Sequence, residues 1–218
     1  HSWFAHIPGL KVVMPTTPHD AKGLLIAAIE DDNPGVFIEH RWLHHIKGEV
    51  PAGHYTVPIG PARLARPGSD VTIVAFSYMV LEALEAAAAP AADGIDAEVI
   101  DVRSLRPLAR EVLLASLGKT GRLVVADTGH STAGMAGEII AIASENAFGS
   151  LQAAPRRVCL PDCPTPTSPT LAAAYYPRAG HIVAAVRATL QRAPNEADLL
   201  VPAGEELDKP NPAFTGPF

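Results

Sequence analysis

The sequence predicts an α/β protein built from open sheets in three layers, with helices on both faces of the strands. Short apolar runs alternate with amphipathic segments along most of the 218 residues, which is the order expected of βαβ units. A hydrophobic fraction of 48% and a charged fraction of 18% allow the chain to bury a core. Several amphipathic segments are rich in alanine, whose short side chain lets a helix pack close to a sheet.

Residues 10–40 read as the first βαβ unit. The apolar run at residues 10–14 predicts a buried strand that ends at a proline, and residues 35–40 predict a second strand. Between them we expect a helix, because Thr17 can cap its start and Pro18 suits its first position. A strand, a helix and a strand of this length favour a parallel sheet.

Residues 47–70 lack helical periodicity and contain prolines and glycines at short intervals, so we expect a linker with short extended pieces. A domain boundary near residues 67–70 follows. Residues 1–68 then form the first region, residues 69–193 a second domain and residues 194–218 an extended tail. The tail is acidic and rich in proline, with spaced apolar side chains. It is either solvated or an arm that lies on a partner surface.

The second half repeats the alternation of strands and helices. We expect strands at residues 71–77, 97–105, 122–129 and 156–162. We expect helices after residue 78 (interrupted at Pro90), from Pro107 to Gly118, at 135–148 and at 179–192. Four strands that alternate with helices predict an open α/β domain.

Charge and composition argue against several kinds of partner. The net charge of −6 argues against nucleic acid, which binds to basic surfaces. No apolar run is long enough to span a bilayer, so we expect no membrane contact and predict a cytoplasmic protein. The two cysteines, Cys159 and Cys163, are too few for a disulfide framework and are expected to be reduced.

Two segments follow predicted strands of the second half. The glycine-rich residues 127–138 lie where open α/β sheets place ligands, and a phosphate could rest on the next helix. The simpler interpretation, which we favour, is that these glycines allow a tight turn and close packing. Asp101, Arg103 and Arg106 follow another strand, where they could form a structural ion-pair network or face a partner.

Two further segments of the first half could hold a metal ion. Residues 40–45 (HRWLHH) contain three histidines, but no further ligand completes a zinc set, so we expect a surface cluster. Asp31, Asp32 and Asn33 lie at a helix end, beside carbonyl groups that have no helical partner. These oxygens suit a hard cation, although an acidic helix terminus without a ligand is the simpler interpretation.

Stretches in consistent order, from residue 3 to about residue 190, resemble one family. They are WFAHIPGLKVVMPTTPHDAKGLLIAAIEDDNPGVFIEH, KGEVPAG, SDVTIVAFSYMVLEALEAA, AEVIDVRSLRPL, KTGRLVVADTG and GEIIAIASENAF. The chain is similar to the β subunit of the thiamine-diphosphate-dependent decarboxylating component of pyruvate, branched-chain 2-oxoacid and acetoin dehydrogenases. The resemblance implies an incomplete pyrimidine-binding domain followed by a transketolase C-terminal-like domain. We therefore expect that the upstream part of such a subunit was removed from this chain, was disordered and left out, or is naturally absent.

The resemblance also implies an activity and its partners. The enzyme would decarboxylate a small 2-oxoacid oxidatively and transfer the acyl group to a lipoyl group. It would act only with an α subunit, in a heterotetramer of two α and two β subunits, and pass its product to a lipoyl acyltransferase. Thiamine diphosphate would lie at the subunit interface, with Mg²⁺ held mainly by the α subunit. The cofactor-binding residues of this subunit are expected upstream of the given sequence.

Two sites carry over from the family by position. His1 matches the family histidine near the lipoyl entry, which assists acyl transfer as a proton donor or by orienting groups. Ala28, Ile29, Asp31 and Asn33 match a potassium site, to which the first two residues contribute carbonyl oxygens.

Other functions stay open alongside this resemblance. Residues 127–134 (DTGHSTAG) differ from the commoner acidic or aromatic residues of the family, so a specialised branch is one alternative. The chain could also belong to a split transketolase-like enzyme that transfers an acyl or ketol group in a biosynthetic pathway. A third alternative is a non-catalytic interaction module.

Overall fold

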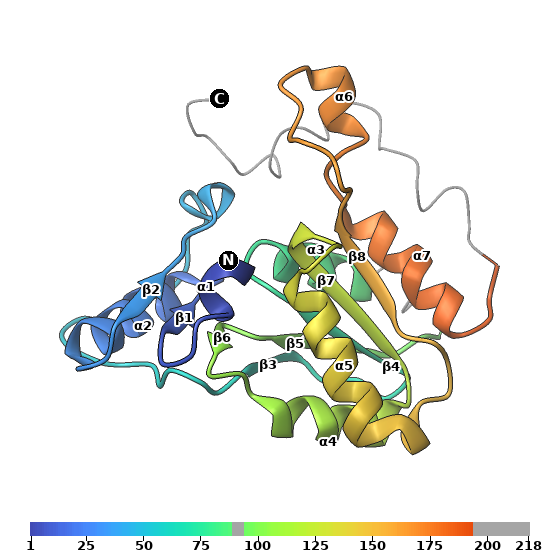
Figure 1. The fold of residues 1–218 in the computed structure, drawn as a ribbon, viewed down its shortest axis with the longest axis horizontal. Helices are drawn as coiled ribbons and strands as arrows, with labels where there is room; N and C mark the ends of the chain where they lie inside the picture. Colours follow the sequence, from blue (N-terminus) through green and yellow to red (C-terminus); the bar gives the residue numbers. More distant parts are fainter. Residues whose placement is uncertain (89–93, 194–218) are drawn as a thin grey trace.

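The computed structural model describes residues 1–88 and 94–193, which form two open sheets with helices around them (Figure 1). The strand order is β2-β1-β6 in the smaller sheet and β3-β5-β4-β7-β8 in the larger one. The prediction of an α/β fold with open sheets is confirmed. The predicted interruption at Pro90 and the predicted tail at residues 194–218 lie outside the described residues.

The smaller sheet is built around β1 (Lys11–Val13). The strand β2 (Gly35–Phe37) pairs with β1 in parallel, and the helix α2 (Pro18–Glu30) connects them, as the sequence predicts. The hydroxyl of Thr17 accepts a hydrogen bond from the backbone N–H of Asp20 at 3.1 Å, so the predicted cap is confirmed. A short helix, α1 (Ser2–Ala5), precedes β1 and was not predicted.

The larger sheet has four parallel strands and one antiparallel edge strand. Its strands are β3 (Arg63–Arg66), β4 (Val71–Ala75), β5 (Ala97–Asp101), β7 (Leu123–His130) and β8 (Arg156–Leu160). The strand β3 pairs antiparallel with β5 and lies in the segment that we expected to be a linker. Its sequence, RLAR, lacks an apolar run because an edge strand buries few side chains; Leu64 is 51% exposed.

The prediction of a single strand at residues 97–105 is wrong. The strand β5 ends at Asp101, and Arg103 has a φ of 54°, which turns the chain away from the larger sheet. The next strand, β6 (Ser104–Arg106), pairs antiparallel with β1 of the smaller sheet. Apolar residues continue across this turn because both strands are buried, so hydrophobicity does not reveal the break. The crossing of the chain joins the two sheets.

In the described part of the chain, four long helices cover the larger sheet. They are α3 (Met79–Ala88), α4 (Arg110–Thr120), α5 (Met135–Ala147) and α7 (Ala179–Thr189). The helices α3 and α7 pack on one face, and α4 and α5 pack on the other, which gives the predicted three layers (Figure 1). The core under α4 and α5 extends to Val12 and Met14 beside the smaller sheet.

Smaller differences from the prediction concern helix ends and short helices. The helix α4 begins at Arg110 and not at Pro107, which follows a cis peptide bond. Within residues 1–88 and 94–193, three short helices in the connections were not predicted: η1 (Arg41–Leu43), η3 (Phe148–Ser150) and α6 (Pro169–Ala173). Among the described helices, none has the length and hydrophobicity that a membrane span requires.

Candidate functional site

The carboxyl ends of β4 and β7 mark the point at which an open α/β sheet places its ligands. These strands are neighbours, yet β4 continues into α3 on one face and β7 into α5 on the other. Phe76 and Ser77 follow β4, and both are buried. Ser77 has a φ of 49°, a left-handed conformation that residues other than glycine rarely adopt. Strand order therefore indicates a candidate site between these two strand ends.

His1 lies at this point, although it is the first residue of the sequence and both strands come much later in the chain (Figure 1). Its Nε2 is 3.0 Å from Oδ1 of Asp127, and its ring stacks on Phe76 with the ring centroids 6.3 Å apart. The side chain of His1 is 8% exposed and that of Asp127 is fully buried. The contact has the distance of an ion pair but not the alignment of a hydrogen bond. A buried imidazole beside a buried carboxylate is suited to proton transfer.

The backbone holds Asp127 in place. Its Oδ1 accepts a hydrogen bond from the N–H of Gly129 at 3.0 Å, and its Oδ2 accepts one from the N–H of Ala136 at 3.2 Å, in the first turn of α5. A Cβ at Gly129 would lie 2.9 Å from Cε1 of His1. The glycine-rich loop therefore makes a tight turn and also gives the His1 ring the space that it occupies.

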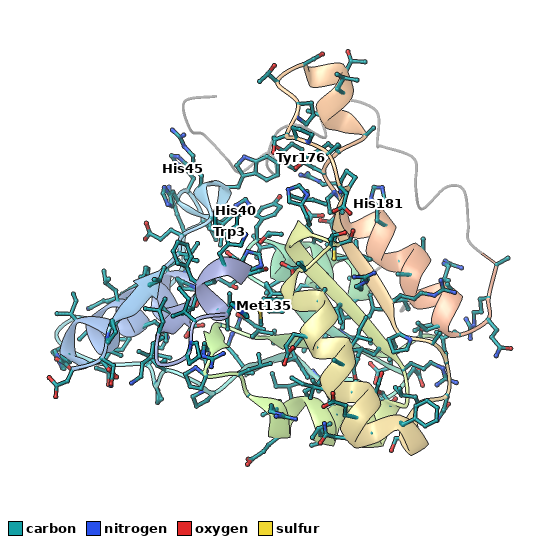
Figure 2. The ribbon with its side chains drawn as sticks, viewed as in Figure 1. Trp3, His40, His45, Met135, Tyr176 and His181 are labelled. Carbon is teal, nitrogen blue, oxygen red and sulfur yellow. The ribbon has the colours of Figure 1, made fainter. Side chains whose placement is uncertain are left out.

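A cavity of about 650 Å³ opens beside the same loop. Its walls include Ser2 in α1, His6 directly after α1, and Met135 at the start of α5. Met135 is labelled in Figure 2. The charged residues that line it are Arg106, Arg110, Arg157 and Glu138. Positive charge therefore predominates in this cavity, which adjoins the segment that carries His1.

The residues of the predicted potassium site lie at the end of α2. The backbone N–H and the side-chain amide of Asn33 both donate to Oδ1 of Asp31 at 2.8 Å, and the ammonium of Lys11 pairs with Oδ2. The hydrogen bond from Lys11 lowers the pKa of Asp31 to about 2. Ala28, Asp31 and Asn33 line a cavity of about 10 Å³, whereas Ile29 does not. This volume can hold one water molecule or one ion of similar size, such as K⁺.

The three histidines of residues 40–45 do not converge. Nδ1 of His40 accepts a hydrogen bond from the N–H of Trp42 at 3.3 Å, and its ring stacks on Tyr78. Burial lowers the pKa of His40 to about 4. In Figure 2, His40 lies toward the middle of the molecule and His45 farther out. Across residues 1–88 and 94–193, no three His, Cys, Asp or Glu side chains are arranged to hold a metal ion.

The charges predicted at the end of β5 take part in a buried ion-pair network. Nη2 of Arg63 lies 2.9 Å from Oδ2 of Asp101, and Nη1 of Arg103 lies 3.0 Å from Oδ1 of Asp20. Burial raises the pKa of Asp101, and the hydrogen bond from Arg63 opposes that rise. Arg106 donates to the carbonyl oxygen of Ala5 in α1. These contacts tie the larger sheet to the N-terminal segment.

Sequence reasoning did not single out three residues of these sites: Asp20, Arg63 and Asp127. Asp20 and Arg63 meet their partners only through the fold, because 83 residues separate Asp20 from Arg103 and 38 separate Arg63 from Asp101. Asp127 carried a weak signal, since an acidic residue at the end of a buried strand needs a partner.

Two domain families and several proteins of known type match this chain. Residues 60–182 match the family described as "Transketolase, C-terminal domain", and residues 1–45 match "Transketolase, pyrimidine binding domain". The chain is 50% identical over 188 residues to the acetoin:2,6-dichlorophenolindophenol oxidoreductase subunit beta of Cupriavidus necator, with 86% of this chain and 56% of that protein covered. It is 46% identical over 194 residues to the mitochondrial pyruvate dehydrogenase E1 component subunit beta of Caenorhabditis elegans, with 87% and 55% covered.

A solved structure is also similar. It is described as "Split gene transketolase, inactive beta4 tetramer", and it matches with a TM-score of 0.73 and 28% sequence identity. The match covers 87% of this chain and 60% of that one. The chain spans about half the length of the curated relatives it matches.

Proposed function

The chain belongs to the transketolase C-terminal domain family, and from this membership we propose that it forms part of the β subunit of a decarboxylating 2-oxoacid dehydrogenase component. The observation that carries the proposal is the order of the two matches, a pyrimidine-binding segment followed by a transketolase C-terminal domain. Two β subunits of known type are similar over 86% and 87% of this chain. The proposed partner is an α subunit, in a heterotetramer.

The cofactor of this activity is thiamine diphosphate, which supplies the electron sink for decarboxylation. We assign no cofactor contact to the described residues, because the chain spans about half of its relatives. The proposed sources of those contacts are the part of a β subunit that this sequence does not cover and the α subunit, which would also hold Mg²⁺. A cytoplasmic location also stays a prediction.

We propose that His1 assists the transfer of the acyl group to the lipoyl group of an acyltransferase component. Its burial at the carboxyl ends of β4 and β7 and its contact with Asp127 support this role. A histidine can hold or release a proton near neutral pH, which acyl transfer to a disulfide requires. The basic cavity beside α1 would give an approaching acidic partner a complementary surface.

We propose that K⁺ binds at the end of α2, through carbonyl oxygens of Ala28 and Ile29 and through Asp31 and Asn33. The cavity lined by Ala28, Asp31 and Asn33 supports the location. Lys11 already pairs with the carboxylate of Asp31, so backbone carbonyls would supply most of the ligand set. K⁺ should then raise the unfolding temperature at concentrations at which Na⁺ does not.

The experiment combines the full-length subunit with its α subunit, thiamine diphosphate and Mg²⁺. The assay measures reduction of the dye 2,6-dichlorophenolindophenol with pyruvate, a branched-chain 2-oxoacid and acetoin in turn. We expect one of the two 2-oxoacids to reduce the dye, and only when both subunits and the cofactor are present; reduction with acetoin alone, which has no carboxylate to lose, would indicate cleavage of acetoin in place of decarboxylation. No reduction with any α subunit tested would overturn the proposal.

A split transketolase is the second candidate, because a structure of that description matches with a TM-score of 0.73. Such an enzyme would transfer an acyl or two-carbon ketol unit in a biosynthetic pathway and would not need a lipoyl partner. Ketol transfer without dye reduction would favour this function. Binding of an α chain without either reaction would favour a non-catalytic interaction module.

A further inference from the structure

We infer that Asp127 is a positioning residue for His1: its buried carboxylate orients the imidazole so that Nε2 carries a proton and Nδ1 is left for proton exchange. The inference rests on the role proposed above for His1. It adds a residue to which the family resemblance assigned no role.

The contact between the two side chains is short and shielded from water. Oδ1 of Asp127 lies 3.0 Å from Nε2 of His1, with side-chain exposures of 0% and 8%. Although the pair lacks the alignment of a hydrogen bond, a negative charge this close to Nε2 favours the ring tautomer with its proton on that nitrogen. Because burial weakens screening, this preference is larger than the same contact would produce at the surface.

Asp127 cannot easily turn away from the ring. Each of its oxygens already accepts one backbone N–H, from Gly129 and from Ala136. The carboxylate is therefore oriented by the end of β7 and the start of α5, whatever the position of His1. Such a fixed anion can set the orientation of a neighbouring ring.

The remaining surroundings restrict the ring to one place. Phe76, which follows β4, stacks on the imidazole, and Gly129 leaves room where a Cβ would lie 2.9 Å from Cε1 and 3.2 Å from Nε2. The His1 ring is thus held by the ends of two adjacent, buried strands. Correct placement of a proton-transfer group on rigid elements is what a transfer step needs.

A purely structural role for Asp127 is the alternative, since the carboxylate also caps the loop before α5. The two half-reactions of the proposed enzyme separate these roles. Reduction of 2,6-dichlorophenolindophenol requires decarboxylation and no lipoyl group, whereas acylation of a lipoyl domain requires both steps. Loss of positioning should affect lipoyl acylation alone, while a distorted loop should lower both activities.

The experiment compares Asp127→Asn with the wild type in the full-length subunit assembled with its α subunit. We expect lipoyl acylation to fall about 10- to 100-fold, since positioned proton transfer contributes about 10²–10⁴-fold. Dye reduction should change by less than about twofold. Asp70→Asn is the matched control, because Oδ2 of Asp70 also accepts a backbone N–H, from Asp96 at 2.7 Å, at the amino end of β4.

A second variant tests the same point without removing the charge. Gly129→Ala keeps Asp127 intact and forces the His1 ring to move by a few tenths of an ångström. We expect Gly129→Ala to lower lipoyl acylation selectively. If the Asp127→Asn subunit does not assemble with its α subunit, the Gly129→Ala variant tests the inference in its place. The ¹⁵N NMR signals of the His1 ring provide an independent readout, with the proton on Nε2 in the wild type and a mixture of tautomers in Asp127→Asn.

Three results would overturn the inference. Equal losses in both half-reactions would assign Asp127 a structural role, and unchanged acylation in Asp127→Asn would remove any role in transfer. Unchanged acylation in His1→Ala would show that the proposed role of His1 is wrong, and the role of Asp127 would fall with it. If the wild-type complex performs neither half-reaction, the proposed function fails first, which distinguishes that failure from the others.

Discussion

The carboxylate of Asp20 and the guanidinium of Arg103 join the two sheets of this protein. Oδ1 of Asp20 lies 3.0 Å from Nη1 of Arg103, and Asp20 is 2% exposed. Asp20 belongs to the first turn of α2, whereas Arg103 lies where the chain crosses from β5 to β6. Nη2 of Arg103 also donates to the carbonyl oxygen of Pro61 at 2.9 Å. The contact therefore fixes the crossing against α2.

Removing this carboxylate should be strongly destabilising. Asp20→Ala leaves the buried guanidinium of Arg103 without its anion, so we expect the free energy of unfolding to fall by about 3–5 kcal/mol. Urea denaturation of the wild type and the variant measures the difference. Asp96→Ala is the control, because the pair of Asp96 with Arg66 is half-exposed and should contribute about 1 kcal/mol or less. Similar losses in the two variants would contradict this account.

Two glycines should respond in opposite ways to replacement by alanine. A Cβ at Gly68 would lie 2.6 Å from the carbonyl oxygen of Ala97 and closer still to the adjoining backbone, so Gly68→Ala should cost about 2 kcal/mol or more. A Cβ at Gly118 in α4 would meet open space. Gly118→Ala should therefore stabilise the protein by about 0.5–1 kcal/mol. Thermal unfolding of both variants measures this, and a stable Gly68→Ala variant would contradict the close approach of the segment after β3 to β5.

The pair of Lys11 and Asp31 should be visible in an acid titration. Because the folded-state pKa of Asp31 is lowered from 3.8 to about 2, its contribution to stability is present above pH 3.8 and is lost as the pH falls toward 2. Lys11→Met should return the pKa of Asp31 toward its ordinary value. NMR titration of the carboxyl carbon measures the change. Lys22→Met is the control, since Lys22 donates to Pro51 and should leave the titration of Asp31 unaltered.

His40 should make stability depend on pH in mildly acidic solution. Burial lowers its folded-state pKa from 6.5 to about 4, so the unfolded chain binds a proton first. Stability is then highest above pH 6.5 and falls as the pH drops to 4, by at most about 3 kcal/mol. His40→Phe keeps an aromatic ring against Tyr78 and removes the titrating group. Unfolding curves at pH 7 and pH 4.5 should differ less in this variant; an unchanged difference would show that other groups cause it.

Elements with local signals could be predicted from the sequence. The start of α2 was predicted because Thr17 and Pro18 act on the turn that they begin, and this cap is present. The strands β3 and β6 could not be assigned because their partners lie far away in the sequence. Arg63–Arg66 is a strand only because β5 offers an edge, and residues 104–106 pair with β1 across about ninety residues.

The candidate site was predictable in a similar, partial way. The glycine-rich loop after β7 was identified from its place at the end of a strand, and His1 from the family resemblance. Their contact could not be foreseen, because it depends on how α1 lies against the larger sheet. A role could be assigned to Asp127 only from the fold, which places its Oδ1 3.0 Å from Nε2 of His1.

Release of CO₂ from a 2-oxoacid by the full-length subunit mixed with its α subunit would show whether this chain belongs to a decarboxylating enzyme. The account predicts release by the mixture, no release by either subunit alone, and loss of release when thiamine diphosphate is omitted. Release by neither subunit nor the mixture, with every 2-oxoacid and α subunit tested, would contradict it.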